Sequence, residues 1–191
     1  SAREFVDFLV DAGQKYWQLL PLGPTSYGDS PYQSNSAYAG NPYLIDLDLL
    51  IEEGLLTHDE VAGRDWCWSS DRVDFGRQYN NKLSVLRLAY ARFQGSTDFD
   101  AFLAEQAAWL PDFALFMALK GENNSAPWFS WEEGLKFRKA EALTAAKDRL
   151  SDEIRFYCFV QFVFYKQWTA LLAYAHEKGI EIIGDVPIYV P

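Results

Sequence analysis

Two short stretches of the chain carry residue types that could together bind a sugar. Tyr27 and Tyr32 flank the segment 28–31, which consists of Gly, Asp, Ser and Pro. Asp185 is an acidic residue within the apolar run 180–190. Sugars present C–H faces to aromatic rings and hydroxyl groups to carboxylates, which accept hydrogen bonds. A loop that mixes Tyr, Asp, Ser and Gln is therefore chemically suited to carbohydrate.

Each of these residues also has a purely structural interpretation. Aromatic side chains make up 17% of the chain, so one alternative is that the tyrosines only cover the mouth of a barrel. A carboxylate in an apolar run needs a partner. The alternative for Asp185 is therefore a hydrogen bond to a loop amide or an ion pair with an arginine. The residues alone leave these alternatives open.

Two helix–strand units must position these residues. Apolar residues recur with helical spacing over 5–12, and the nearly continuous apolar run 16–22 follows after Gly13. Runs of that kind are typical of strands buried on both faces of a parallel sheet. The pattern recurs as a long helix over 152–178 and a second apolar strand over 180–190. Two such units predict a parallel sheet.

The first predicted strand leads into a loop over 23–42, rich in Gly, Pro, Ser and Asn and without periodicity. Loops of this length inside a compact domain are usually functional or disordered, and three tyrosines in this one argue against disorder. Ligands collect at the carboxyl ends of parallel strands. We therefore expect this loop and Asp185 to be neighbours on one face.

The region 43–150 predicts helices in short pieces. The local predictions are a brief strand at 44–47, a capping box from Thr57 to Glu60, a helix over 77–94, a helix from the N-cap Thr97 through Trp109, and a helix over 112–120 with Pro111 in its first turn and Gly121 at its end. Ser151 is the predicted N-cap of the long helix that follows.

Charge and composition exclude several classes of protein. The chain has 17 Lys and Arg against 27 Asp and Glu, a net charge of −10, and no basic cluster, so it is a poor candidate for nucleic acid or an anionic membrane. No apolar run approaches the roughly 20 residues that a membrane helix needs. Cys67 and Cys158 predict reduced thiols, and the two histidines make a His-rich metal site unexpected. Residues 1–4 lack the pattern of a secretory signal, so we expect a cytoplasmic protein.

The longer segments around these residues form a specific series. They are YWQLLPLGPTSYGDSPYQSNSAYAGNPYLIDLDLL at 16–50, DFALFMALK at 112–120, and the stretch from Phe162 through GIEIIGDVPIYV at 179–190. In this order they closely resemble the 4-α-glucanotransferases, also called amylomaltases or disproportionating enzymes. The resemblance extends over essentially the whole chain.

The resemblance implies an α/β fold: a partial (β/α)8 TIM barrel with a large helical insertion. It also implies an enzyme that transfers a segment of an α-1,4-glucan to the 4-hydroxyl of an acceptor sugar. In that family the reaction is a retaining double displacement with an Asp nucleophile and a Glu acid/base, without a cofactor or a metal. The implied partners are α-1,4-glucans and maltooligosaccharides, with neither nucleic acid nor membrane.

Carried over residue by residue, the resemblance implies substrate-binding roles for five residues. Tyr32 would stack against the sugar next to the scissile bond, and Asp185 would hydrogen-bond hydroxyls of that same sugar. Tyr27 matches an aromatic residue that in some members holds a second stretch of glucan. Asp29 and Ser30 would shape the loop.

The resemblance also implies that parts of the family's barrel lie outside this chain. The first barrel strand is expected before Ser1, and both catalytic carboxylates beyond Pro191, so no catalytic residue is assigned here. Residues 1–50 and 151–191 are expected to be barrel units of one catalytic domain, around a helical insertion at about 51–150. The isolated chain is accordingly expected to lack transferase activity.

Two other interpretations remain open at this point. One is a free-standing glucan-binding module, for which the tyrosine-containing loop would suffice. The other is a different barrel enzyme, such as an α-amylase-type hydrolase, which shares the helix–strand opening. That family usually carries a His shortly after the Asp at the end of this strand.

Overall fold

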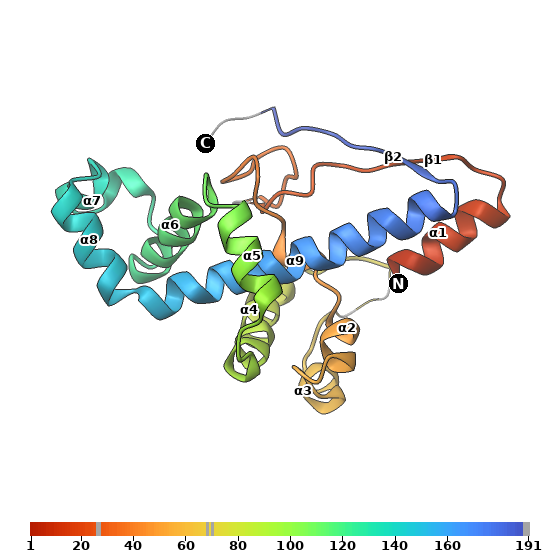
Figure 1. Ribbon diagram of the computed structural model, residues 1–191, viewed down its shortest axis with the longest axis horizontal. Helices are drawn as coiled ribbons and strands as arrows, with labels where there is room; N and C mark the ends of the chain where they lie inside the picture. The colour runs from red at the N-terminus through yellow and green to blue at the C-terminus, as the bar shows by residue number, and fades with distance from the viewer. Residues whose placement is uncertain (26–27, 68, 70, 189–191) are drawn as a thin grey trace. The chain divides into compact units, whose positions relative to one another are not determined.

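The structure is a computed structural model that describes residues 1–25, 28–67, 69 and 71–188. In chain order its elements are α1 (Ala2–Asp11), β1 (Tyr16–Gln18), the 3-10 helix η1 (Pro42–Leu44), α2 (Leu47–Glu52), α3 (His58–Ala62), α4 (Phe75–Arg92), α5 (Thr97–Glu105), α6 (Leu110–Glu122), the 3-10 helix η2 (Trp128–Ser130), α7 (Glu133–Lys136), α8 (Ala140–Arg149), α9 (Ser151–Glu177) and β2 (Glu181–Ile183) (Figure 1).

The chain packs as two compact units. The first unit comprises Ser1–Gln94 with Gln161–Pro191, and the second comprises Gly95–Val160. These units describe local packing, so the domain bounds expected from the resemblance stay a prediction.

In the first unit the two strands pair in parallel, as predicted. Tyr16 lies opposite Glu181, Trp17 opposite Ile182, and Gln18 opposite Ile183. One face of this pair is covered by α1 and the end of α9 (Figure 1). There the buried residues Val6 and Leu9 of α1 pack with Ala175 of α9 and with Ile180. The two helix–strand units inferred from the apolar spacing are thus confirmed.

Both strands are shorter and more exposed than predicted. The runs 16–22 and 180–190 were expected to be strands buried on both faces, but the strands end at Gln18 and Ile183. Pro21 and Pro187 have no amide hydrogen to donate to a ladder, so pairing stops near them although the runs remain apolar. Only one face of the pair has helices packed on it within the described residues, and Tyr16 on the other face is 64% exposed.

The long helix is confirmed, but Ser151 is not its N-cap. Ser151 is already the first helical residue of α9. Leu150 alone separates it from α8, which ends at Arg149. The Ile154 amide donates to the Leu150 carbonyl at 2.9 Å, which is the first helical hydrogen bond of α9. The helix before Ser151, α8, is not among the helices predicted from the sequence.

The strand predicted at 44–47 is wrong. Its place is taken by η1 and by the start of α2. The Asn41 side chain accepts a hydrogen bond from the Tyr43 amide, and the Asp46 side chain accepts one from the Asp48 amide. These two caps favour helical turns over an extended chain.

The other predicted helices form with small changes at their ends. The capping box of Thr57 and Glu60 is confirmed, and α4 covers the predicted helix over 77–94. The N-cap of α5 is Ser96 rather than Thr97, and α5 ends at Glu105. Pro111 lies in the first turn of α6 as predicted, but α6 continues past Gly121 to Glu122.

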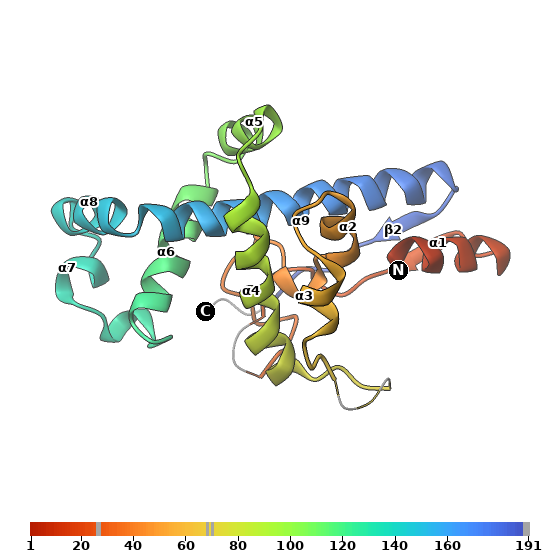
Figure 2. The same cartoon turned by 90° about the horizontal axis from the view of Figure 1, so that it is seen from below.

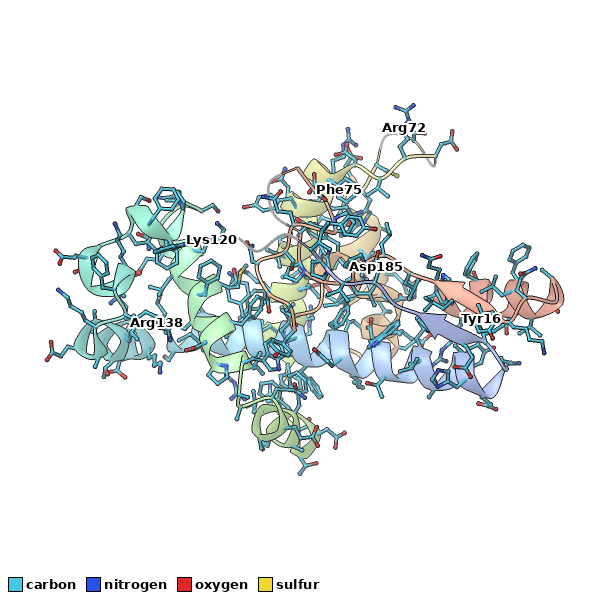
Figure 3. All side chains as sticks on the ribbon, turned by 90° about the horizontal axis from the view of Figure 1, so that it is seen from above. Tyr16, Arg72, Phe75, Lys120, Arg138 and Asp185 are labelled. Carbon is cyan, nitrogen blue, oxygen red and sulfur yellow. The ribbon has the colours of Figure 1, made fainter. Side chains whose placement is uncertain are left out.

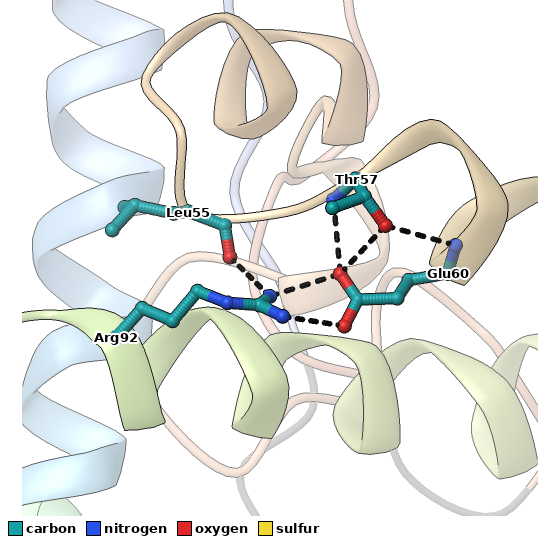
Figure 4. Close-up of polar contacts among 4 residues, drawn as sticks. All are labelled: Leu55, Thr57, Glu60 and Arg92. Carbon is teal, nitrogen blue, oxygen red and sulfur yellow. Dashed lines mark hydrogen bonds and ion pairs between the residues drawn. The ribbon is translucent and has the colours of Figure 1, made fainter.

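A polar network fastens α3 to α4 (Figure 4). The Arg92 guanidinium donates to both Glu60 carboxylate oxygens, at 2.7 and 2.9 Å, and to the Leu55 carbonyl at 3.0 Å. The same carboxylate accepts from the Thr57 amide at 2.9 Å. Bidentate Arg–carboxylate pairs are among the stronger surface interactions. The bonds from Arg92 and Thr57 lower the pKa of Glu60 to about 2, because both groups bind the charged form of the carboxylate.

In the second unit, α6, α7 and α8 lie side by side (Figure 2). Leu115 and Leu119 of α6 form its buried centre with Trp131 and with Ala146 of α8. None of the helices in the described ranges is both long enough and apolar enough to span a bilayer.

Candidate functional site

The two residues on which the sequence prediction rested meet in the structure. The Tyr32 hydroxyl donates a hydrogen bond to Oδ2 of Asp185 at 2.8 Å, across 153 residues of sequence. The other carboxylate oxygen, Oδ1, accepts from the Val186 amide at 2.7 Å. The predicted proximity of the loop and Asp185 is therefore confirmed.

Parallel pairing of β1 with β2 explains this meeting. Because the strands run in the same direction, the chain that leaves β1 and the chain that leaves β2 emerge at the same end. Figure 3 shows Tyr16 at the start of this strand pair and Asp185 well beyond its other end. Among the described residues, Asp185 forms no ion pair with an arginine or a lysine. Of the structural alternatives, only the bond to a neighbouring backbone amide is found.

A tight turn presents Tyr32, and we call residues 23–42 the site loop. Asp29 has φ 55° and so lies in the left-handed region, which Asp tolerates better than most residues. The Ser30 hydroxyl accepts from the Tyr32 amide at 3.4 Å, and the Ser30 carbonyl accepts from the Gln33 amide at 3.2 Å. Both residues thus belong to the turn that precedes Tyr32, and their expected part in substrate binding stays a prediction. Tyr27 lies outside the described residues.

Short links close the site loop on itself. Thr25 and Ser34 form an isolated antiparallel bridge. The Asn41 amide donates to the Leu22 carbonyl at 2.8 Å, which joins the two ends. These contacts hold the described residues of a loop that is rich in Gly, Ser and Asn.

Sequence reasoning missed the residues that hold the site loop from outside. Gln161 of α9 pairs with both backbone groups of Gly40 in the loop, and Gln167 does the same with Asp46, four residues after the end of the loop. The Tyr165 hydroxyl donates to the Tyr38 carbonyl at 2.5 Å. The one available signal was that Gln161 falls within the apolar stripe of the long helix, where a buried polar side chain needs partners.

A cavity of about 170 Å³ lies beside Asp185. Its walls include Tyr38 and Gly40 of the site loop, Trp168 of α9, and Pro187. The cavity thus combines aromatic and aliphatic surface with one carboxylate.

Electrostatics at the site follow from these contacts. The hydrogen bond to Asp185 raises the pKa of Tyr32, because ionising the phenol would remove the donor and place two negative charges together. Burial raises the pKa of Tyr43, next to the site loop, to about 12, and the negative charge of Asp29 adds to this effect. Both phenols are therefore protonated at neutral pH.

No cluster of three or more His, Cys, Asp or Glu able to hold a metal ion is found within the described part of the chain. The polar groups at the site include those of Tyr32, Asp185 and the backbone around them. What this arrangement offers a ligand is a rigid aromatic ring, a phenol and a carboxylate within one hydrogen bond of each other.

An α/β arrangement with a ligand-type pair at the ends of parallel strands is typical of barrel enzymes. The family model for 4-alpha-glucanotransferase matches residues 1–191, and the chain belongs to this family. The match decides against the α-amylase-type interpretation.

Curated relatives agree over the whole chain. A 4-alpha-glucanotransferase from Clostridium butyricum is 48% identical over 192 residues, which is 100% of this chain and 39% of that protein. A 4-alpha-glucanotransferase from Thermus thermophilus is 47% identical over 196 residues, 100% of this chain and 38% of that protein. The chain thus spans 38–39% of the length of these two relatives.

Solved structures confirm the fold. An amylomaltase from Streptococcus agalactiae, in complex with acarbose, superposes with a TM-score of 0.93 at 42% identity over 98% of this chain and 39% of that chain. An amylomaltase from Corynebacterium glutamicum, 20% identical, shares the fold with a TM-score of 0.73, over 98% of this chain and 27% of that chain. The expected fold class, a partial α/β barrel with a helical insertion, is confirmed.

Proposed function

We propose that this chain supplies part of the sugar-binding cleft of a 4-α-glucanotransferase. That enzyme would move a segment of an α-1,4-glucan onto the 4-hydroxyl of an acceptor sugar by a retaining double displacement. The observation that carries the proposal is the hydrogen bond between Tyr32 and Asp185, residues to which the family resemblance assigns contacts with one and the same sugar. Family membership over residues 1–191 supports the reaction type.

The geometry suggests how the pair would bind a pyranose. Each carboxylate oxygen of Asp185 already accepts one hydrogen bond and has a lone pair left for a sugar hydroxyl. The Tyr32 oxygen, whose hydrogen is engaged by Asp185, can accept from another hydroxyl. Its ring, held in one orientation by the same bond, would stack on the C–H face of the sugar. Asp29 and Ser30 would act through the turn that presents Tyr32, and Tyr27 would contact a second stretch of glucan.

Bond breaking is assigned to residues outside this chain. In the proposal Asp185 binds hydroxyls and is not the nucleophile, and the catalytic Asp and Glu lie beyond Pro191. Incubation of this chain with maltotriose is expected to produce neither glucose nor longer maltodextrins. Clear turnover in that assay would contradict the proposed division of roles.

Binding provides the direct test. Isothermal titration calorimetry of this chain with maltoheptaose is expected to show binding, and Asp185→Asn is expected to weaken it by about tenfold, because a charged acceptor for sugar hydroxyls is lost. Asp59→Asn on the exposed α3 is the matched control and should leave the affinity unchanged. No heat of binding for the unchanged chain, or equal affinities for all three proteins, would refute the role of this site.

A cytoplasmic location belongs to the same proposal. Cys67 is exposed and Cys158 is buried, and both are free thiols. An exposed free thiol is more common in reducing compartments, which supports this location. Burial raises the pKa of Cys158 to about 11, so that this thiol stays protonated and behaves as a small apolar residue.

A further inference from the structure

One side chain of α9 holds the site loop as a neighbouring strand would. The Gly40 amide donates to Oε1 of Gln161 at 2.7 Å, and Nε2 of Gln161 donates to the Gly40 carbonyl at 3.0 Å. We call this pair of bonds the Gln161 clamp. Gln161 is 2% exposed, so its carboxamide and the backbone of Gly40 depend on each other for hydrogen bonding.

The residue that the clamp holds is fixed by shape as well. A Cβ atom on Gly40 would lie 2.0 Å from a ring carbon of Phe164, which is three residues after Gln161 on the same helix. Glycine is therefore required here for close approach of the loop backbone to α9. Two hydrogen bonds and a steric contact determine the position of the loop at this point.

A second clamp on α9 provides an internal comparison. The Asp46 amide donates to Oε1 of Gln167 at 2.8 Å, and Nε2 of Gln167 donates to the Asp46 carbonyl at 2.9 Å. The two clamps have the same chemistry and differ in place. Gly40 lies inside the loop that the bond between Asn41 and Leu22 closes, and Asp46 lies outside it.

Short links connect the Gln161 clamp to Tyr32. The Ala39 amide, next to Gly40, donates to the Ser36 hydroxyl at 3.1 Å. The Ser34 hydroxyl donates to the Ser36 carbonyl at 2.8 Å. Ser34 is two residues from Tyr32 and forms the bridge with Thr25. A displacement of Gly40 would thus be passed to the turn that presents the Tyr32 ring.

Asp185 is connected to the C-terminal end of the same helix through β2. Past its C-terminus, α9 turns at Gly179 into β2, and Ala175 of α9 packs with Ile180 in the buried cluster under the strands. The site loop is held by Gln161 near the middle of α9, and Asp185 follows the strand after its end. One helix therefore locates both partners of the Tyr32–Asp185 bond.

We propose that Gln161 is a positioning residue for glucan binding: its clamp on Gly40 sets the site loop so that Tyr32 meets Asp185 at the sugar. This inference rests on the proposed function of the Tyr32–Asp185 pair. It assigns a role to a helix residue that does not itself contact the ligand. It also predicts that Gln161 and Gln167, alike in chemistry, differ in their effect on the site.

The test compares Gln161→Met with Gln167→Met in this chain. Methionine keeps the length of the side chain and removes both hydrogen-bonding groups. Both variants should lose thermal stability, since each leaves buried or half-buried backbone groups unpaired. A structural role alone predicts no more than that, so the deciding readout is Tyr32 itself, followed by ¹³C NMR of ring-labelled tyrosine and assigned with Tyr32→Phe.

In the unchanged chain and in Gln167→Met, the pKa of Tyr32 should lie above its ordinary value of about 10. In Gln161→Met this rise should be lost, because the phenol no longer meets Asp185. A Tyr32 titration that is the same in Gln161→Met as in the unchanged chain would overturn the inference, provided that circular dichroism shows the folded helix content. If Gln161→Met does not fold, Gln161→Asn is measured instead, since it keeps a neutral carboxamide but is one methylene shorter and should give a smaller shift in the same direction.

Binding completes the test. Gln161→Met should weaken maltoheptaose binding by about tenfold, and Tyr32→Phe should add little to it, because both changes remove the same contact. Full additivity of the two losses would overturn the inference. If the unchanged chain does not bind maltoheptaose, the proposed function fails, and the Tyr32 titration still decides whether Gln161 positions the loop.

Discussion

The hydrogen bond between Tyr32 and Asp185 fixes the orientation of both side chains. The bond fixes the ring plane of a partly exposed tyrosine at little entropic cost on ligand binding, since the side chain is already ordered. It also orients the carboxylate, whose second oxygen is held by the Val186 amide. A ligand would therefore meet a preorganised ring and carboxylate.

The two parts of Tyr32 can be separated by substitution. Tyr32→Phe removes the hydroxyl and keeps the ring, and we expect maltoheptaose binding to weaken by about threefold to tenfold. Tyr32→Ala also removes the stacking surface and should weaken binding further, by about tenfold beyond Tyr32→Phe. Titration calorimetry of both variants measures the difference. Equal affinities of the Phe and Ala variants would show that the ring does not contact the sugar.

Lys82 of α4 shows a different kind of residue-scale effect. Its ammonium group is buried, donates to the Ile45 carbonyl at 2.6 Å, and lies 5.9 Å from the centre of the Trp66 ring. Burial lowers the pKa of Lys82 from 10.5 to about 8, and the negative charge of Asp46 only partly opposes this.

The sign of the pH effect follows from proton binding. Between pH 8 and pH 10.5 the unfolded chain keeps the proton on Lys82 that the folded chain has lost. Stability from this group therefore rises with pH across that window, by up to about 3 kcal/mol. Lys82→Met should remove this rise in urea unfolding at pH 8 to 10.5, and the exposed Lys15→Met is the control. An unchanged pH slope in Lys82→Met would show that the buried amine does not titrate in this range.

At this scale the sequence predicted the contact that simple topology controls and missed those that depend on packing. Tyr32 and Asp185 could be placed together because carboxyl ends of parallel strands share one edge. Gln161 could not be paired with Gly40, because such a bond depends on where α9 lies over the loop. Lys82 likewise gave no sign of burial, since α4 around it looks amphipathic.

Among the elements, α3 is joined to α4 by an ion pair. Glu60 serves both as the N3 residue of the capping box and as the partner of Arg92 (Figure 4). The folded pKa of about 2 lies below the ordinary value of 4.5, so the stabilisation is complete above pH 4.5 and is lost as pH falls towards 2.

Glu60→Gln should abolish this part of the acid sensitivity. We expect the free energy of unfolding of the unchanged chain to fall more steeply between pH 4.5 and pH 2 than that of Glu60→Gln. Urea unfolding followed by circular dichroism measures both slopes, with Glu52→Gln on the exposed face of α2 as the control. Parallel curves for the unchanged chain and Glu60→Gln would contradict the assignment.

The contact of the site loop with α9 can be tested by its steric requirement. Gly40→Ala places a methyl group against the Phe164 ring, where no space exists, and should destabilise the fold by about 1–3 kcal/mol. Gly121→Ala in α6 is the matched control, because nothing lies within 4 Å of its added Cβ and alanine favours a helix. Thermal unfolding should show a loss for the first variant and no loss, or a small gain, for the second. Similar melting temperatures for both would mean that the loop backbone is free to move away from Phe164.

Elements were predicted well where local chemistry sets them, and less well where neighbours do. The capping box at Thr57 and the proline in the first turn of α6 are local signals, and both were right. The lengths of β1 and β2 were wrong, because an apolar run shows that residues avoid water but does not show where the ladder ends. The prediction of a brief strand at 44–47 was also wrong, because the caps at Asn41 and Asp46 favour helical turns over an extended chain.

For the whole chain, the most informative surface is the one left uncovered around the strands. Leu20, Ile183, Val186 and Ile188 are 57%, 48%, 69% and 72% exposed. A two-stranded sheet also has two edges whose backbone groups can pair with other chains.

We therefore expect the isolated chain to self-associate through this surface, in competition with its net charge of −10. Salt screens the repulsion and leaves apolar contact intact, so association in sedimentation velocity should increase from about 20 mM to about 500 mM NaCl. Ile183→Lys with Val186→Lys should reduce it, although the added positive charges lower the net repulsion. Because the global charge effect acts in the opposite direction, a loss of association can only come from the surface itself.

A matched control makes the test specific to the strands. Phe137 is 63% exposed and lies in the second unit, so Phe137→Lys removes a comparable apolar side chain elsewhere. This variant should associate as the unchanged chain does. If it reduces association as much as the strand variants do, exposed apolar residues promote association wherever they lie. The surface around the strands would then not be the specific contact surface.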